Sequence, residues 1–100
     1  METEPANNQT SLHVIVEGHV QGVGFRYFVK NMAEKLSLKG WVRNRFDGSV
    51  ELLAEGDHEN LLKLLDAVRI GPSHSIVTHV QADWSASEDR YSQFSFLPTE

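Results

Sequence analysis

The feature that most constrains this chain is a glycine-rich segment that joins a strand-like pattern to a helix-like pattern. Before it, Leu12, Val14 and Val16 alternate with other residues at the period of two that is typical of a β-strand. After it, apolar residues recur at helical spacing, at Phe25, Phe28, Val29, Met32 and Leu36. The segment from Val16 to Arg26 therefore predicts a tight β-to-α junction.

Such a junction is a place where the backbone can bind an anion. The first four N–H groups of a helix have no acceptor within the helix, and the helix dipole makes that end positive. Glycines let the backbone close around a ligand. The segment lacks the Gly-Lys-Ser/Thr ending of a Walker loop and the GxGxxG fingerprint of dinucleotide-binding proteins. It predicts an anion cradle of another kind.

Charges at the start of the predicted helix support this interpretation. Arg26 and Lys30 lie in its first turns, and no acidic residue occurs before Glu34. A cation at an exposed helix N-terminus is unfavourable by about 0.3–1 kcal/mol, and a bound anion would reverse that penalty. The second predicted helix begins with Asp57 and Glu59, which have the favourable sign. The alternative is an ordinary glycine-rich turn followed by a solvated arginine.

Composition narrows the possible classes of protein. The chain has 100 residues, enough for one domain with its own core, and no cysteine, which excludes a disulfide framework, a thiolate nucleophile and a cysteine-based zinc site. The histidines lie on different predicted elements without a His-x-x-x-His pair, which argues against a bound metal. The net charge of −5 argues against sequence-independent nucleic-acid binding and favours an ordinary cytoplasmic protein.

The ends of the chain differ in character. Residues 1–11 are polar and acidic, and they predict a disordered N-terminal tail without the basic and apolar regions of a signal peptide. The folded domain is expected to span residues 12–100. No apolar run approaches the length of a transmembrane helix, so no membrane association is expected.

The remaining patterns predict the order of elements. Residues 41–46 predict a second strand, and Asp47-Gly48 predicts a type I′ hairpin turn into a third strand near residues 50–54. Asp57 can cap a second helix, whose apolar stripe contains Leu61, Leu64, Leu65 and Val68. Residues 76–84 predict a fourth strand, and residues 94–96 predict a short closing strand with Phe94 and Phe96 on one face.

This order, βαββαβ with a short extra strand, predicts an α+β fold of the ferredoxin-like kind. We expect an antiparallel sheet with two helices on one face, the first strand paired with the third and the fourth, and the second strand at an edge. Val77 and Val80 cannot share a face in a regular strand. If both are core residues, a β-bulge lies between them.

The second strand contains an unusual residue, Asn44. Alternation places Asn44 on one face with Val42 and Phe46, and places Arg43 and Arg45 on the other face, where a solvated role is expected. Asparagine is unfavourable in strands, so its position needs a reason. Either its amide hydrogen-bonds the hairpin locally, or it presents the amide to a ligand, and this segment alone leaves both open.

The two segments together resemble the acylphosphatase family. The family pattern Gly-x-Val-Gln-Gly-Val-x-Phe-Arg is matched from Gly18 to Arg26, and the pattern Gly-aromatic-Val-basic-Asn-x-x-x-Gly-x-Val is matched from Gly40 to Val50. The similarity continues through Gly56, Gly71-Pro72, the fourth strand and Phe94-x-Phe96, and covers nearly all of the chain after residue 11.

This resemblance implies an enzyme that hydrolyses small-molecule acyl phosphates to carboxylate and inorganic phosphate without a metal or a cofactor. It implies that Arg26 and Asn44 are the catalytic residues, with Asn44 positioning the attacking water. The implied phosphate-binding residues are Gly18, His19, Val20, Gln21, Gly22, Val23, Gly24, Phe25 and Arg26. A cytoplasmic monomer that acts alone on its substrate is sufficient for this activity.

The residue types suit that chemistry. A leaving carboxylate has a pKa of about 4, so it departs without a general acid. Phosphoryl transfer needs mainly positioning and charge stabilisation, which loop amides and the bidentate fork of Arg26 can supply. Asn44 is not a base, but its carbonyl can hold water in line while the water's proton passes to a phosphate oxygen.

Non-catalytic functions are compatible with the same predicted fold. A ferredoxin-like RNA-binding module would carry stacking aromatics on its third strand, but residues 49–55 contain none, and the RNP patterns are not matched. A second possibility is an anion-binding module without catalysis. A third is a substrate-delivery module like the similar domains inside larger carbamoyl-phosphate-handling proteins.

Overall fold

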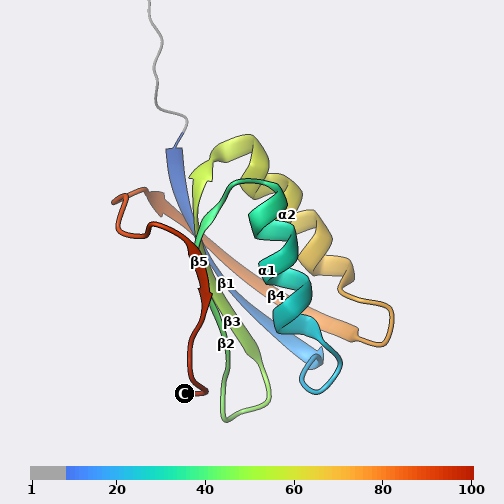
Figure 1. Ribbon diagram of the computed structural model, residues 1–100. Coiled ribbons are helices and arrows are strands. Elements are labelled where there is room, and N and C mark those ends of the chain that lie inside the picture. Colours follow the sequence, from blue (N-terminus) through green and yellow to red (C-terminus); the bar gives the residue numbers. More distant parts are fainter. Residues whose placement is uncertain (1–8) are drawn as a thin grey trace, which may run out of the picture.

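In the computed structural model, which describes residues 9–100, the chain forms five strands and two helices (Figure 1). The elements are β1 (Gln9–His19), α1 (Phe25–Lys35), β2 (Lys39–Asn44), β3 (Val50–Asp57), α2 (His58–Ile70), β4 (Ile76–Ala86) and β5 (Phe94–Phe96). Most of the predicted disordered tail lies outside the described residues. Its last three residues, 9–11, belong instead to β1, where Ser11 is buried and pairs with Glu55 and Ser85.

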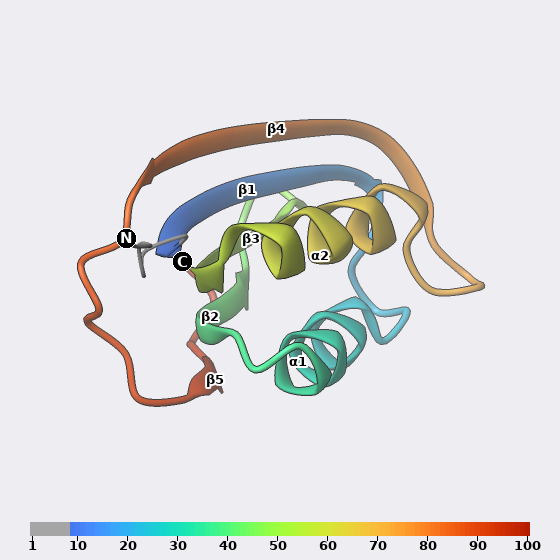
Figure 2. The ribbon, with the colours of Figure 1, turned by 90° about the horizontal axis from the view of Figure 1, so that it is seen from above.

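The sheet has the strand order β4-β1-β3-β2-β5, and both helices lie on one of its faces (Figure 2). The pairs β1–β3, β1–β4 and β2–β3 are antiparallel, as predicted. The prediction that β2 is an edge strand and that the whole sheet is antiparallel is wrong. Strand β5 pairs with β2 in parallel, Gly40 opposite Phe94 and Val42 opposite Phe96, and this pairing buries Phe94 to 3% exposure.

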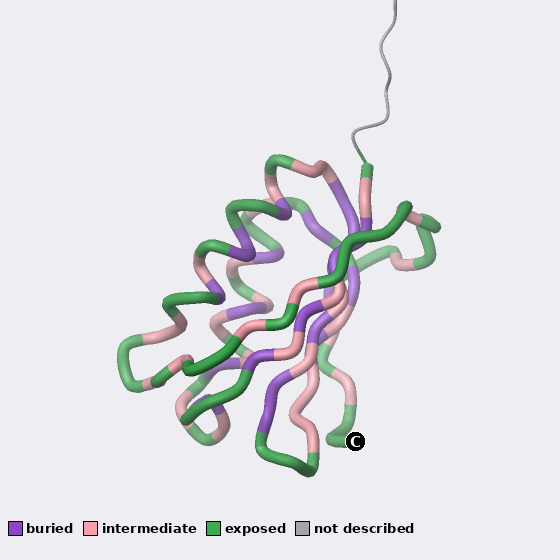
Figure 3. The backbone as a smooth tube through the Cα atoms, turned by 180° about the vertical axis from the view of Figure 1, so that it is seen from behind, coloured by how far each residue is buried: buried purple, intermediate pink, exposed green. Residues whose placement is uncertain are grey.

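The core lies between the sheet and the helices. The apolar stripe predicted for α2 is buried, and α1 contributes Phe25, Val29 and Ala33. In β3, buried and half-buried residues alternate from Val50 to Ala54, and the next residues, Glu55 and Gly56, are both buried (Figure 3). The largest fully buried side chains are Phe25, Leu12, Leu52, Leu61, Leu64, Val14, Val16, Val20, Val29, Val42, Val50 and Val68. Burial of each such side chain is favourable by about 1.5–3 kcal/mol.

The predicted β-bulge is confirmed. Val77 and Val80 both pack against the core. Glu17 of β1 pairs with His79, whereas the next residue, Gly18, pairs with Val77, so Thr78 is the extra residue in β4. The bulge lies near the end of β1, and beyond it Gly18 and His19 still pair with Val77 and Ile76, so β1 stays paired with β4 to its last residue.

The turn between β2 and β3 differs from the prediction. The Arg45 N–H donates to the Ser49 carbonyl at 2.9 Å, and the Gly48 N–H donates to the Arg45 carbonyl at 3.1 Å, which leaves a three-residue loop. Gly48 has a φ of 96°, but Asp47 does not have a positive φ, so the type I′ prediction is wrong. Phe46 lies in this loop and is 83% exposed, instead of extending the strand.

Substitutions of two glycines in this hairpin, Gly40 and Gly48, should destabilise the fold to different extents. A Cβ at Gly40 would lie 1.9 Å from the Leu53 carbonyl oxygen, whereas a Cβ at Gly48 would meet nothing within 4 Å; both have positive φ. Gly48→Ala should therefore lower the free energy of unfolding by the strain of the backbone alone, about 1–2 kcal/mol. Gly40→Ala should lower it by more than about 3 kcal/mol, because the adjacent strand must also move.

Urea denaturation of the two alanine variants and the parent measures this difference. Equal losses in the two variants would contradict the role assigned to the close approach of Gly40 to β3.

Candidate active site

The junction between β1 and α1 contains a run of backbone amides that have no acceptor among the described residues. Helix α1 begins after Gly24, which has φ 78° and ψ 17°, and no side chain caps this end. The Phe28 N–H donates to the Gly24 carbonyl at 3.0 Å, which is the first helical hydrogen bond. Within residues 9–100, the amides from Gly22 to Tyr27 have no acceptor. This end of α1 is therefore a set of convergent donors with the positive end of the helix dipole behind it.

A small cavity of about 110 Å³ lies at this end of α1. Its lining residues come from the loop, from the first turn of α1 and from the end of β2: Val20, Gly22, Gly24, Phe25, Arg26, Tyr27 and Asn44. The two residues predicted to be catalytic, Arg26 and Asn44, are thus brought to one cavity although they are 18 positions apart in the chain.

Arg26 is a cation without a partner among the described residues. No carboxylate of residues 9–100 lies within 4.0 Å of its side chain, which is half-buried. Its guanidinium carbon lies 5.8 Å from the centre of the Phe96 ring. A cation–π contact of this kind is favourable by about 0.5–1 kcal/mol at an exposed site. It holds the guanidinium beside the cavity and leaves its N–H groups available to an anion.

Asn44 is the last residue of β2, and its side chain is half-buried. Its backbone carbonyl accepts from the Glu100 N–H at 3.1 Å, but its amide side chain makes no hydrogen bond with another described residue. The alternative in which this amide hydrogen-bonds the hairpin is therefore wrong. An unpaired carboxamide, with one acceptor and two donors, faces the cavity.

Several of the predicted phosphate-binding residues lie outside the cavity. Gly18 and His19 belong to β1, where they pair with Val77 and Ile76, and His19 is exposed. Val23 packs against the core. The sequence prediction missed Tyr27, which lines the cavity; the signal for it was its place directly after Arg26, among the first four amides of the helix.

Gln21 has a different position from the one predicted. Its Nε2 donates to the carbonyl of Arg45 at 2.7 Å and to the carbonyl of Ser49 at 2.8 Å. These two carbonyls belong to the ends of the β2–β3 turn, one residue beyond Asn44 and one before Val50. Gln21 therefore ties the amide-rich loop to the hairpin that carries Asn44, and its side chain is fully used as a donor.

The other arginines of β2 and its turn lie away from the cavity. Arg43 donates from Nε to Glu51 at 2.9 Å on the open face of the sheet, and it also pairs with Glu100. On the same face, His13 and Glu51 are 2.6 Å apart. Burial raises the pKa of the Glu51 carboxyl, but the hydrogen bonds and the charges of His13 and Arg43 together outweigh burial and lower this pKa. Arg43 is thus neutralised rather than available to a ligand.

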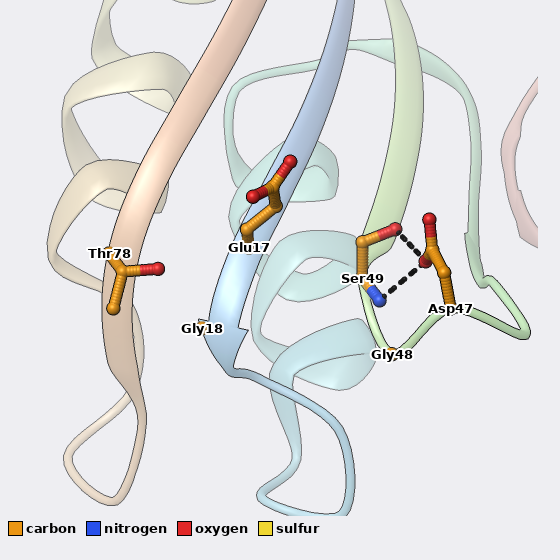
Figure 4. A pocket seen from close by; sticks show the side chains of 6 residues that line it. All are labelled: Glu17, Gly18, Asp47, Gly48, Ser49 and Thr78. Atoms are coloured by element: carbon orange, nitrogen blue, oxygen red, sulfur yellow. Dashed lines mark hydrogen bonds between the residues drawn. The ribbon is translucent and has the colours of Figure 1, made fainter.

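A larger hollow of about 380 Å³ lies on another side of the hairpin (Figure 4). Its lining residues are Glu17, Gly18, Asp47, Gly48, Ser49 and Thr78. The Asp47 carboxylate accepts from the hydroxyl of Ser49 at 2.6 Å and from its amide at 2.9 Å, and these bonds lower its pKa. The residues that line the hollow therefore include two carboxylates and no cation, and the nearby Arg45 lies 4.0 Å from the Asp47 carboxylate. This lining disfavours an anion, whereas the smaller cavity favours one.

The described part of the chain holds neither a metal cluster nor a membrane-spanning helix. Residues 9–100 contain no group of three histidine, aspartate or glutamate side chains placed to bind one metal ion. Neither of their helices combines the length and the apolar character that a bilayer crossing requires.

Comparisons with known proteins agree with this geometry. The family model for acylphosphatase matches residues 12–96. An acylphosphatase from Pyrobaculum calidifontis is 43% identical over 89 residues, which cover 88% of this chain and 81% of that protein. The crystal structure of acylphosphatase from Bacillus subtilis superposes with a TM-score of 0.85 at 45% identity, over 88% of this chain and 98% of that one.

A structure of an acylphosphatase from Coxiella burnetii also superposes with a TM-score of 0.85, at 41% identity, over 90% of this chain and 94% of that one. These matches cover the loop, both helices and the hairpin. The chain therefore belongs to the acylphosphatase family, whose members are enzymes that hydrolyse acyl phosphates.

Proposed function

We propose that the cavity at the start of α1 binds the phosphoryl group of the substrate and that Arg26 and Asn44 act on it there. The observation that carries this proposal is that one small cavity joins amides, a guanidinium and a carboxamide that have no partner among residues 9–100. The amides of Gly22 and of residues 24–27 donate to the non-bridging oxygens, and Arg26 adds a bidentate, charge-assisted pair of hydrogen bonds. The negative charge of the phosphoryl group is thereby balanced before the reaction begins.

In the proposed reaction, the carbonyl of the Asn44 side chain accepts a hydrogen bond from a water molecule and aims its oxygen at phosphorus. The new bond from that oxygen to phosphorus forms while the bond from phosphorus to the carboxyl oxygen breaks. The carboxylate leaves with the electron pair, without protonation, because its pKa is about 4. The proton of the water passes to a phosphate oxygen, so the products are a carboxylate and inorganic phosphate.

We further propose that the enzyme acts as a cytoplasmic monomer and does not bind nucleic acid. Its net charge of −5 opposes binding to a polyanion. RNA-binding domains of this fold class stack bases on aromatics of the open sheet face. Here the middle of that face holds the ion pairs of Glu51 with His13 and Arg43. Retention of single-stranded RNA at physiological salt would contradict this part of the proposal.

Release of phosphate from benzoyl phosphate, compared with release from an alkyl phosphomonoester, tests the reaction as a whole. The acyl phosphate should be hydrolysed and the monoester should not, because an alkoxide leaving group needs a general acid that the cavity does not offer. Equal hydrolysis of both would contradict the proposed mechanism.

Arg26→Ala should abolish binding of inorganic phosphate with little change in the stability of the fold. The variant loses a cation–π contact of about 0.5–1 kcal/mol but also a helix-dipole penalty of about 0.3–1 kcal/mol, and these nearly cancel. Arg26→Lys should rescue binding weakly, because an ammonium cannot form the bidentate pair. Calorimetric titration of phosphate measures the affinity, and urea denaturation measures the stability. An Ala variant that keeps the parent's phosphate affinity would refute the role of Arg26.

Asn44→Ala should lower kcat by about 10² to 10³ and leave phosphate affinity nearly unchanged, as expected for a contact made mainly in the transition state. Asn44→Asp should not restore the activity: a carboxylate could accept from the water, but its charge would lie beside the phosphate dianion and oppose its binding. Steady-state kinetics and phosphate inhibition measure the two effects. An unchanged kcat with a loss of phosphate affinity would make Asn44 a phosphate ligand instead.

Gln21→Glu should lower kcat by about 10-fold or more, because a carboxylate of the same size cannot donate to the carbonyls of Arg45 and Ser49, and the hairpin then shifts relative to the loop. If Gln21 acts through the position of Asn44, the losses in Gln21→Glu and Asn44→Ala should not add in the double variant. Kinetics of the two single variants and the double variant measure this coupling. Additive losses would show that Gln21 does not position Asn44.

A further inference from the structure

The substrate has a second half, the acyl group, for which the small cavity has no room. Pockets that enclose a drug-sized ligand measure about 300–1,000 Å³, whereas this cavity measures about 110 Å³. If the phosphoryl group occupies it, as proposed above, the acyl group must lie at its mouth. The residues at that mouth then determine which acyl phosphates the enzyme prefers.

Tyr27 is the lining residue that extends from the cavity to the surface. Val20 and Phe25 are buried, at 1% and 2% exposure, whereas Tyr27 is 62% exposed. Its ring meets the ring of Phe96 in a T-shaped contact, with centroids 4.8 Å apart and an interplanar angle of 63°. Phe96 is itself 36% exposed. Together, the two rings form an apolar surface next to the cavity, which we call the Tyr27–Phe96 pair.

Two cations border this pair. The Arg26 guanidinium carbon and the Lys30 Nζ lie 5.8 and 5.7 Å from the centre of the Phe96 ring. Lys30 also pairs with Glu34 at 2.5 Å, whereas Arg26 has no carboxylate within reach among the described residues. The arrangement is amphipathic, because an anion-binding end at Arg26 adjoins an aromatic surface that remains partly open to solvent. It matches a ligand with an anionic head and an apolar body.

We propose, on the basis of the function proposed above, that the Tyr27–Phe96 pair is the binding site of the acyl group and selects acyl phosphates with an aromatic or bulky apolar acyl group over acetyl phosphate. An apolar group placed on two rings is removed from water on one side and gains contact area that an acetyl group lacks. Both rings belong to elements fixed by the core, since Phe94 buries β5 against β2.

The test is the ratio of kcat/KM for benzoyl phosphate to kcat/KM for acetyl phosphate. This ratio should fall about 10-fold in Tyr27→Ala and in Phe96→Ala. That factor is at the low end of the range for loss of one apolar contact, because the Tyr27–Phe96 pair remains partly exposed to solvent. Tyr27→Phe and Phe96→Leu, which keep an apolar side chain, should retain most of the ratio. Trp84→Ala is the matched control, because Trp84 is 39% exposed and pairs with Leu12 at the other end of β1. Its ratio should equal that of the parent.

Inorganic phosphate as a competitive inhibitor separates this proposal from the function on which it rests. Phosphate carries no acyl group, so its inhibition constant should change little in Tyr27→Ala while the substrate ratio falls. A uniform loss with both substrates, at an unchanged ratio, would overturn the acyl-site proposal and would make Phe96 a residue that positions Arg26. An inhibition constant that does not respond to Arg26→Ala would instead refute the phosphate site itself.

Discussion

The site depends on one constraint, which is that helix α1 begins without a cap. Natural helices usually satisfy their first amides with a serine, threonine, aspartate or asparagine side chain, and place acidic residues in the first turn. Here the N-cap is Gly24, no acid occurs in the first turn, and Arg26 adds a positive charge. α2 shows the ordinary arrangement, with Asp57 accepting from the Asn60 N–H and Glu59 in its first turn. The N-terminus of α2 is therefore capped by the chain's own side chains, whereas a bound anion would cap the N-terminus of α1.

An open helix start alone would be an anion site without catalysis, and in the proposed mechanism the hairpin supplies the residue that positions the water, Asn44. Asn44 reaches the cavity only because β2 ends there, and Gln21 fixes the distance between the loop and the ends of the turn with two hydrogen bonds. A displacement of about 1 Å in a reacting group can cost about 10² in rate. In the proposed mechanism, loss of the two Gln21 hydrogen bonds would therefore raise the free energy of activation by more than the roughly 0.5–1.5 kcal/mol that a hydrogen bond contributes to stability.

Structural elements with a periodic apolar pattern could be predicted from the sequence, whereas contacts between residues far apart in the sequence could not. The alternation in β1, the helical spacing in α1 and the bulge between Val77 and Val80 follow from local periodicity, and the structure confirms them. Asp47-Gly48 fits more than one turn type, so the loop length was predicted wrongly. The three residues of β5 do not contain enough pattern to specify a parallel pairing with β2. The two bonds of Gln21 cross 24 and 28 positions, a separation at which sequence spacing has no signal.

Because the protein is negatively charged overall, its attraction for a phosphate dianion must come from groups close to the bound anion. At net −5 the protein repels a phosphate dianion at long range, and at physiological ionic strength this repulsion is screened beyond about 8 Å. Affinity must therefore arise within that distance, from groups that act at contact. The hairpin separates the two signs: the carboxylates of Glu17 and Asp47 line the larger hollow, while Arg26 and the free amides line the smaller cavity. Under the mechanism proposed above, the amides are fixed dipoles without charge, so the cavity would attract the phosphoryl group and still release the phosphate product more easily than a cluster of several arginines would.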